Sequence, residues 1–232
     1  MRFWFFILCC LLYSEVAAQP RIAIIIDDIG YRQAASKAAI ELDPHITVAV
    51  IPRSPYGREL AAYAHQLQRE IIIHLPMAAN GTDNLDPGGI TPEHATQQIH
   101  AAIDDAFQRI PNAVGLNNHM GSRTTESTHA MTAVMQSLAE KGAFFVDSRT
   151  SSASVGESIA RDAGVPHTRR HVFLDNEQNY RSINRQFNEL LRHARQHGSA
   201  VAIGHPYPET IAYLKRVLPL LHEAGIEVVP VS

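Results

Sequence analysis

The sequence predicts an α/β fold, a single-domain (β/α) barrel of irregular shape with about seven or eight parallel strands. Two patterns predict it. Short apolar runs rich in Ile and Val alternate with amphipathic stretches through residues 19–232, and strands separated by helices pair in parallel through right-handed crossovers. Acidic and histidine side chains directly follow several of these runs, and the carboxyl ends of the strands in such a barrel share one rim.

The expected strands are short and mostly buried, and they cover residues 21–26, 46–51, 70–73, 113–116, 143–146, 171–174, 199–203 and 226–231. The expected helices cover residues 31–42, 56–68, 125–141, 155–163, 180–197 and 208–224, with one more beginning at Thr91 as the N-cap and Pro92 in its first turn. Four glycines stand where helices should end: Gly142, Gly164, Gly198 and Gly225. The residues after the first strand, Asp27–Gly30, carry no glycine-rich dinucleotide fingerprint, which favours a barrel over a doubly wound open sheet.

The N-terminus predicts export. A positive start at Met1-Arg2 precedes an apolar run over residues 3–13, and small residues follow at Ala17-Ala18. The apolar run is too short to cross a bilayer, which favours a cleaved signal peptide over residues 1–18. Residues 19–232 then form one soluble domain in the periplasm or outside the cell, with no stable membrane insertion after cleavage.

Both cysteines, Cys9 and Cys10, lie within the predicted signal peptide. The exported domain therefore has no thiol, so it can form no disulfide and no zinc–thiolate site. A bound metal would have to be held by histidine and carboxylate side chains. The net charge of −3 and the absence of a basic run give no indication of nucleic-acid binding, so we expect no nucleic-acid partner.

Chemically useful side chains follow five of the expected strands. They are Asp27 and Asp28, His74, Asn117-Asn118-His119, Asp147 with Arg149, and His205. Each has a structural alternative. Asp28 could cap a helix, His74 could be a satisfied structural group, and His205 could only shape a loop. The two asparagines could be turn residues, and Asp147 and Arg149 could form an ion pair. Their joint occurrence at one predicted rim favours a catalytic cleft.

One carboxylate and two imidazoles are a common ligand set for a catalytic divalent metal. A second carboxylate can act as a base, and a further histidine can protonate a leaving group. The chain has no Gly-x-Ser-x-Gly motif, and no cysteine follows residue 18, so a Ser or Cys nucleophile is not indicated. A pair of acids for glycosidic cleavage stays open but would leave the histidines without a role.

At these residues the sequence resembles the divergent polysaccharide deacetylases, which are distant relatives of the NodB-like carbohydrate deacetylases. The resemblance spans essentially all of residues 19–232. It is carried by five segments: Ile24–Gly30, Ile73–Met77, Asn117–Ser122, Phe145–Thr150 and Ala202–Thr210.

The resemblance implies a role for each candidate residue. Asp27 would be the base and Asp28 a metal ligand, His205 would assist the leaving group, and Asp147 and Arg149 would support the site, with Arg149 orienting Asp27. The wider family takes two metal histidines from a His-x-x-x-His motif, but here Arg123 stands four residues after His119. We therefore expect His74 to replace the missing ligand, which makes the metal set Asp28, His74 and His119.

The implied reaction is removal of an N-acetyl or O-acetyl group from an acetylated glycan of the cell envelope. Zinc suits the ligand set best, with manganese, cobalt, nickel and iron as alternatives. Two other functions stay open. One is a catalytically weak or inactive relative that binds envelope glycans or proteins, and the other is a different metal-dependent hydrolase, such as a phosphoesterase or an amidase.

Overall fold

A computed structural model describes residues 19–232 of the chain. The predicted signal peptide lies outside the described residues. Among the helices of residues 19–232, none combines the length and the apolar character that a membrane span requires.

The strands are β1 (Arg21–Ile29), β2 (Thr47–Val50), β3 (Ile71–Met77), β4 (Gly115–Met120), β5 (Phe144–Asp147), β6 (His167–Arg169), β7 (Val172–Phe173), β8 (Ser199–Gly204) and β9 (Glu227–Val228). The helices are α1 (Gln33–Ile40), α2 (Gly57–Gln66), α3 (Thr96–Arg109), α4 (Thr128–Lys141), α5 (Gly156–Asp162), α6 (Tyr180–His197) and α7 (Pro208–Val217), with a 3₁₀ turn at Leu218–Leu220.

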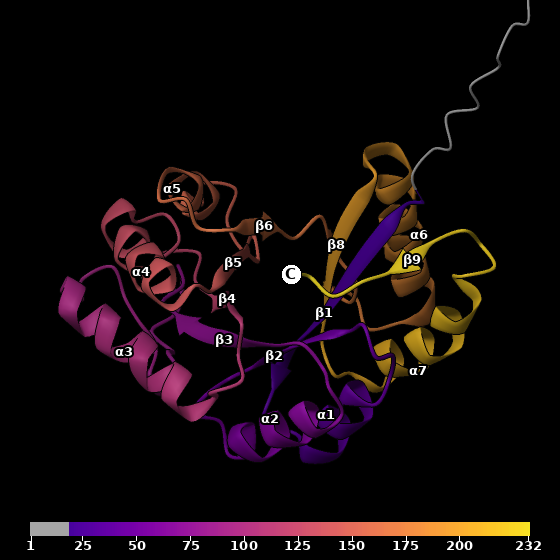
Figure 1. The fold of residues 1–232 in the computed structure, drawn as a ribbon, viewed down its shortest axis with the longest axis horizontal. Helices are drawn as coiled ribbons and strands as arrows, with labels where there is room; N and C mark the ends of the chain where they lie inside the picture. Colours follow the sequence, from indigo (N-terminus) through magenta and orange to yellow (C-terminus); the bar gives the residue numbers. More distant parts are fainter. Residues whose placement is uncertain (1–18) are drawn as a thin grey trace, which may run out of the picture.

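The strands form one parallel sheet in the order β6-β5-β4-β3-β2-β1-β8-β7, and β9 pairs with β1 beside this path. The sheet curls into a (β/α) half-barrel with the helices on its outer face (Figure 1). It is open between β6 and β7, which stand at opposite ends of the strand order. The predicted fold class, an irregular (β/α) barrel, is confirmed.

Two apolar clusters hold the half-barrel together. The larger one packs the outer face of the sheet against the helices. The smaller one fills the concave face and consists of Ala23, Ile25, Ala49, Ile72, Val146, Val201 and Ile203, with Val231 of the C-terminal segment packed against it. The backbone N–H of Val231 donates to Glu70 Oε1 at 2.8 Å, which holds the last residues inside the curve of the sheet (Figure 1).

The main differences from the predicted elements lie at helix ends and at the last strands. The third helix begins at Thr96 and not at Thr91, because residues 91–94 form a turn in which the His94 N–H donates to the Thr91 carbonyl. The Gln98 side chain accepts from Ala95 N–H and caps the helix. The last helix ends at Val217 in place of residue 224, and the strand expected over 226–231 pairs only at Glu227–Val228.

The carboxyl end of β1 departs from regular strand geometry. Side chains alternate along an extended strand, so two consecutive aspartates would point to opposite faces. Here Asp28 has a φ of 57°, and the pairing of β1 with β2 shifts between Ile26 and Ile29. This bulge lets Asp27 and Asp28 face the same side of the sheet. Left-handed φ values also occur at Met120 and Arg149, at the ends of β4 and β5, and such strain concentrates at functional sites.

Gly30 completes this bend, and it generates a stability prediction. Its φ is +138°, and an added Cβ would lie 1.8 Å from Ser54 Oγ, which is held in place by donating to the Ile51 carbonyl. Gly30→Ala should therefore cost about 3 kcal/mol of unfolding free energy, from backbone strain and overpacking together. Denaturant unfolding measures this loss.

The control is Gly81→Ala, because Gly81 also has a positive φ but has open space around it. That variant should lose only about 1 kcal/mol. Equal losses in the two variants would show that the contact with Ser54 does not matter.

Candidate metal centre

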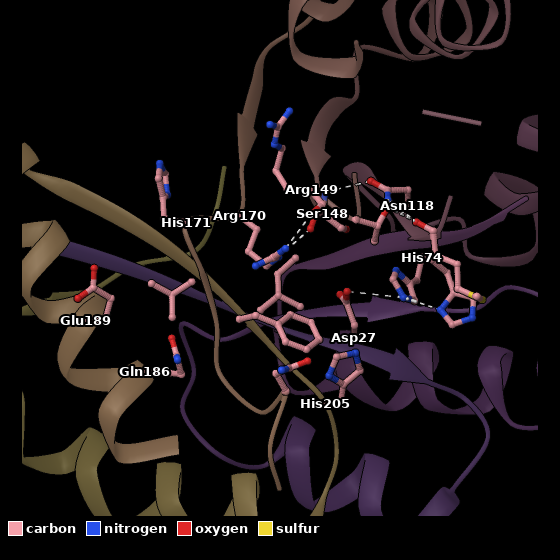
Figure 2. Close-up of a pocket in the computed structure, with 17 residues that line it drawn as sticks. Asp27, His74, Asn118, Ser148, Arg149, Arg170, His171, Gln186, Glu189 and His205 are labelled. Atoms are coloured by element: carbon pink, nitrogen blue, oxygen red, sulfur yellow. Dashed lines mark hydrogen bonds and ion pairs between the residues drawn. The ribbon is translucent and has the colours of Figure 1, made fainter. Parts of the chain in front are cut away.

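Three predicted site residues converge from the last residues of β1 and β4 and from the middle of β3, which continues to Met77 beyond the expected strand end. Asp28 Oδ1 lies 3.2 Å from His74 Nε2 and 3.0 Å from His119 Nδ1. The two ring nitrogens are 3.1 Å apart. These three side chains form the group within residues 19–232 that could hold a metal ion, and Figure 2 shows His74 beside Asp27 at one end of the cavity.

A buried amide fixes the orientation of His74. Asn117 Nδ2 donates to Asp27 Oδ1 at 2.8 Å, and a carboxylate can only accept such a bond. The Asn117 carbonyl oxygen therefore faces His74 Nδ1, at 2.7 Å. His74 Nδ1 must carry the proton, so Nε2 presents a lone pair to Asp28 and His119.

The atoms of this triangle fit a divalent metal. Ligands about 2.0–2.1 Å from a tetrahedral ion lie roughly 3.4 Å apart, close to the observed separations of 3.0–3.2 Å. Asp28 Oδ1 is buried and has no well-aligned hydrogen-bond donor among residues 19–232. A buried acceptor left in this state needs a partner, and a cation between the three atoms would supply one.

The electrostatics of the centre also favour a bound cation. Burial lowers the pKa of His74, but the carboxylates of Asp27 and Asp28 outweigh it and raise that pKa. Burial raises the pKa of Asp28, yet the neighbouring rings of His119 and His74 hold it far below its ordinary value. Burial dominates at Asp27 and raises its pKa above the ordinary value. The carboxylate field that draws a proton to His74 would equally attract a divalent ion.

His205 lies at the end of β8 and is held by an aspartate that the sequence analysis did not select. The backbone N–H of His205 donates to Asp175 Oδ2 at 2.6 Å, and the ring Nδ1 of His205 lies 2.9 Å from Asp175 Oδ1. The Thr210 hydroxyl also donates to Asp175, at 2.7 Å. Burial lowers the pKa of His205, but the Asp175 hydrogen bond and the charges of Asp27, Asp175 and Asp28 raise it to about 9.

Asp147 ends β5, and Arg149 Nη1 lies 3.9 Å from its Oδ2, which is the ion pair that the sequence analysis named as the structural alternative. Asp147 is fully buried and accepts from the Arg149 N–H and the Ser154 hydroxyl, at 2.8 and 2.7 Å, so it supports the loop after β5. The Arg149 guanidinium donates to the Ser152 carbonyl and points away from Asp27 (Figure 2). Among residues 19–232 no hydrogen bond or ion pair joins Arg149 to Asp27, so a role for Arg149 in orienting Asp27 would need a different side-chain position.

Arg170 is an arginine on which the charge of Asp27 acts. The Asp27 and Asp147 carboxylates both raise its pKa, although burial dominates and lowers it. Its guanidinium donates to the carbonyls of Ser148 and Arg149, at 2.7 and 2.9 Å, and lies over the Phe173 ring. Arg170 follows β6, a strand that the apolar pattern did not reveal, and this explains why it was missed.

A cavity of about 660 Å³ opens beside the centre. It runs from Asp27, His119 and His205 to the side chains of α6 that face it, Gln186 and Glu189 (Figure 2). Phe173 forms part of its wall. Polar side chains line this cleft together with the apolar Val172, Phe173 and Ile203, a mixture that is typical of sites for small-molecule ligands.

Sequence comparison places the chain among known proteins. The family described as "Divergent polysaccharide deacetylase" matches residues 24–232. An uncharacterized protein of Haemophilus influenzae is 39% identical over 220 residues, which cover 94% of this chain and 79% of that protein. The uncharacterized protein YibQ of Escherichia coli is 40% identical over 205 residues, which cover 88% of this chain but 64% of YibQ.

Solved structures share the fold. An uncharacterized protein of Agrobacterium tumefaciens superposes with a TM-score of 0.89 at 26% identity, covering 93% of this chain and 89% of that chain. A family 4 carbohydrate esterase of Streptomyces lividans, solved in complex with acetate, superposes with a TM-score of 0.57 at 14% identity. The match covers 93% of this chain and 95% of the esterase. A carbohydrate esterase family 4 (CE4) pseudoenzyme of Bacillus anthracis superposes with a TM-score of 0.56 at 13% identity. The match covers 92% of this chain and 64% of the pseudoenzyme.

The geometry predicts one metal site per chain. Protein purified without a His tag should retain, or take up after incubation with zinc, close to one equivalent of metal by elemental analysis. His119→Ala and His74→Ala should each reduce the metal content at least tenfold, because each variant lacks one of the three ligand atoms. The control is His129→Ala, since His129 is exposed and its ring contacts the His94 carbonyl. Unchanged metal content in His74→Ala would exclude His74 as a ligand.

Proposed function

The chain belongs to the divergent polysaccharide deacetylase family, and we propose that it is an exported, metal-dependent hydrolase that removes acetyl groups from a glycan of the cell envelope. The observation that carries the proposal is the arrangement of Asp28, His74 and His119 around one point, with Asp27 and His205 at the same cavity. A ligand triad, a neighbouring carboxylate and an opposing acid are the parts that hydrolysis of an amide or ester needs.

The ligand set would hold a divalent ion, for which zinc is the best match. Such an ion, when bound, lowers the pKa of a water molecule and polarises the carbonyl group of the acetyl substituent. Asp27 is placed to accept the proton of the attacking water, because its Oδ2 lies 3.6 Å from His74 Nε2 and its Oδ1 is held by Asn117. Because Asn117 bonds to both Asp27 and His74, it holds the base and this metal ligand at a fixed distance from each other.

His205 is placed to donate the proton that the leaving amine or alkoxide requires. It lines the cavity together with Asp27, and its pKa of about 9 keeps it protonated at neutral pH. Asp175 orients the ring through Nδ1, so Nε2 carries the proton that can be transferred. In this scheme Asp27 takes a proton and His205 gives one, which completes hydrolysis.

The ligand set differs from the His-x-x-x-His pattern of the wider family. Arg123, at the position of the second histidine, pairs with Glu93 at 2.9 Å and is exposed. His74 of β3 supplies the third ligand atom from the neighbouring strand instead. The missing motif therefore does not leave the centre incomplete.

A second candidate is a glycan-binding protein without catalysis. It is favoured by the fold of the Bacillus anthracis pseudoenzyme, which shows that this architecture occurs without activity. The complete set of ligand triad, base and acid in this chain supports the enzymatic function more strongly.

Acetate release tests the proposal. Zinc-loaded protein should liberate acetate from N-acetylated oligosaccharides or from O-acetylated glycans, and a chelator should abolish the release. Asp27→Asn should lower turnover by about 100-fold or more, because it removes the base, while zinc content stays near that of the wild type. Tight glycan binding without acetate release from any acetylated glycan would favour the binding function.

The Asp175–His205 pair generates a pH prediction. His205 must be protonated to act as an acid, so activity should be present below its pKa and fall as the pH rises through about 9. Asp175→Asn removes the charge that raises this pKa, so the alkaline limb of the kcat profile should move toward the ordinary value of 6.5. The matched control is Asp162→Asn, an exposed position on α5. If the alkaline limb of the kcat profile does not shift in Asp175→Asn, His205 is not the acid.

A further inference from the structure

We propose that Asp86, in the loop between β3 and α3, is a positioning residue that fixes the ring of His119 for metal binding. This inference rests on the proposed metal site. Asp86 Oδ2 lies 3.4 Å from His119 Nε2, on the side of the ring opposite the nitrogen that faces Asp28. The loop carries no residue that the ligand set itself requires.

The two nitrogens of His119 face different partners, and this defines the tautomer. Nδ1 lies 3.0 Å from Asp28 Oδ1 and 3.1 Å from His74 Nε2, so it is the ligand atom. Nε2 faces the Asp86 carboxylate. An ionised carboxylate can accept a hydrogen bond but cannot donate one. Asp86 therefore favours the form with the proton on Nε2 and the lone pair on Nδ1. A carboxylate behind a metal-bound imidazole also increases its basicity.

Asp86 is itself held in place. Tyr31 is a neighbour of Asp86, and burial together with that carboxylate raises the pKa of the Tyr31 hydroxyl to about 12. The Gly89 N–H donates to the Asp86 carbonyl at 3.0 Å. The ends of the loop are tied by the bond from Ala78 N–H to the Ile90 carbonyl, at 2.9 Å.

The two ligand histidines are thus oriented by different means. His74 is buried, and the amide of Asn117 holds it from a neighbouring strand. His119 is partly exposed, and its outer nitrogen is supported by a loop carboxylate. Loss of such an outer partner commonly weakens metal affinity by about 10- to 100-fold. Asp86 and its loop would therefore determine how firmly the centre holds its ion.

Zinc affinity tests the inference, measured by competition with a chromophoric chelator for the full exported domain. Asp86→Ala should bind zinc about 10- to 100-fold more weakly than the wild type. Asp86→Asn should lose less, because its amide oxygen is also an acceptor that can face the Nε2–H. The matched control is Asp83→Ala, an exposed position in the same loop, which should bind zinc as the wild type does.

Cobalt-substituted protein gives a readout that a purely structural role would not change. Its proton NMR spectrum should show two shifted N–H signals, from His74 Nδ1 and His119 Nε2. In Asp86→Ala the His119 signal should exchange faster with water, while the His74 signal, bonded to Asn117, stays unchanged and reports an intact fold.

Wild-type zinc affinity in Asp86→Ala, or an equal loss in Asp83→Ala, would overturn the role of Asp86 and leave the proposed function standing. A wild-type protein that binds neither zinc nor cobalt would overturn both.

Discussion

The site depends on the carboxamide of Asn117. It lies between an acid and a histidine from two other strands and bonds to both, with Nδ2 toward Asp27 and Oδ1 toward His74. A buried amide can satisfy both partners in only one orientation, because the carboxylate cannot donate. This one constraint holds the base, sets the tautomer of His74 and directs a lone pair to the point that Asp28 and His119 also face. Without it, a buried carboxylate would lose its donor and the imidazole its orientation.

The half-barrel delivers these groups to one place by register and by local strain. His74 pairs directly with Asn117 across β3 and β4, and Asn117 and His119 share a face because they are two residues apart in a strand. The bulge at Asp28 adds a carboxylate that a regular β1 would send to the opposite face. The opening between β6 and β7 leaves room for the cavity, with Arg170 and Phe173 on its wall. The curved sheet therefore brings the side chains of the centre together, and the opening between β6 and β7 lets a ligand reach them.

Much of this arrangement could be predicted from the sequence, since the strands are continuous apolar runs and polar residues follow them. The rule that residues after parallel strands meet at one rim selects Asp27, Asp28, His74, His119 and His205. The same rule, applied to the strand expected at 171–174, would have selected Asp175. The sequence places Asn117 at the same rim with a turn as its structural alternative, and it does not reveal the bonds to Asp27 and His74, because these partners are distant in sequence.

Other features could not be predicted from local patterns. The Arg149 side chain bonds to the Ser152 carbonyl, whereas Arg170 bonds to the carbonyls of Ser148 and Arg149, and no apolar pattern reveals these contacts. The start of α3 at Thr96 depends on the Gln98 cap and on the turn at residues 91–94, which compete with the helix signal of Pro92. The contact of Asp86 with His119 joins a polar loop to a strand end, and the sequence of such a loop does not define its path.

The most direct test of the central claim is the position of the metal in a zinc-loaded crystal, located by anomalous scattering at the zinc absorption edge. The account predicts one strong peak about 2.0–2.2 Å from Asp28 Oδ1, His74 Nε2 and His119 Nδ1. A peak at another set of side chains, or none at this point in crystals saturated with zinc, would contradict it.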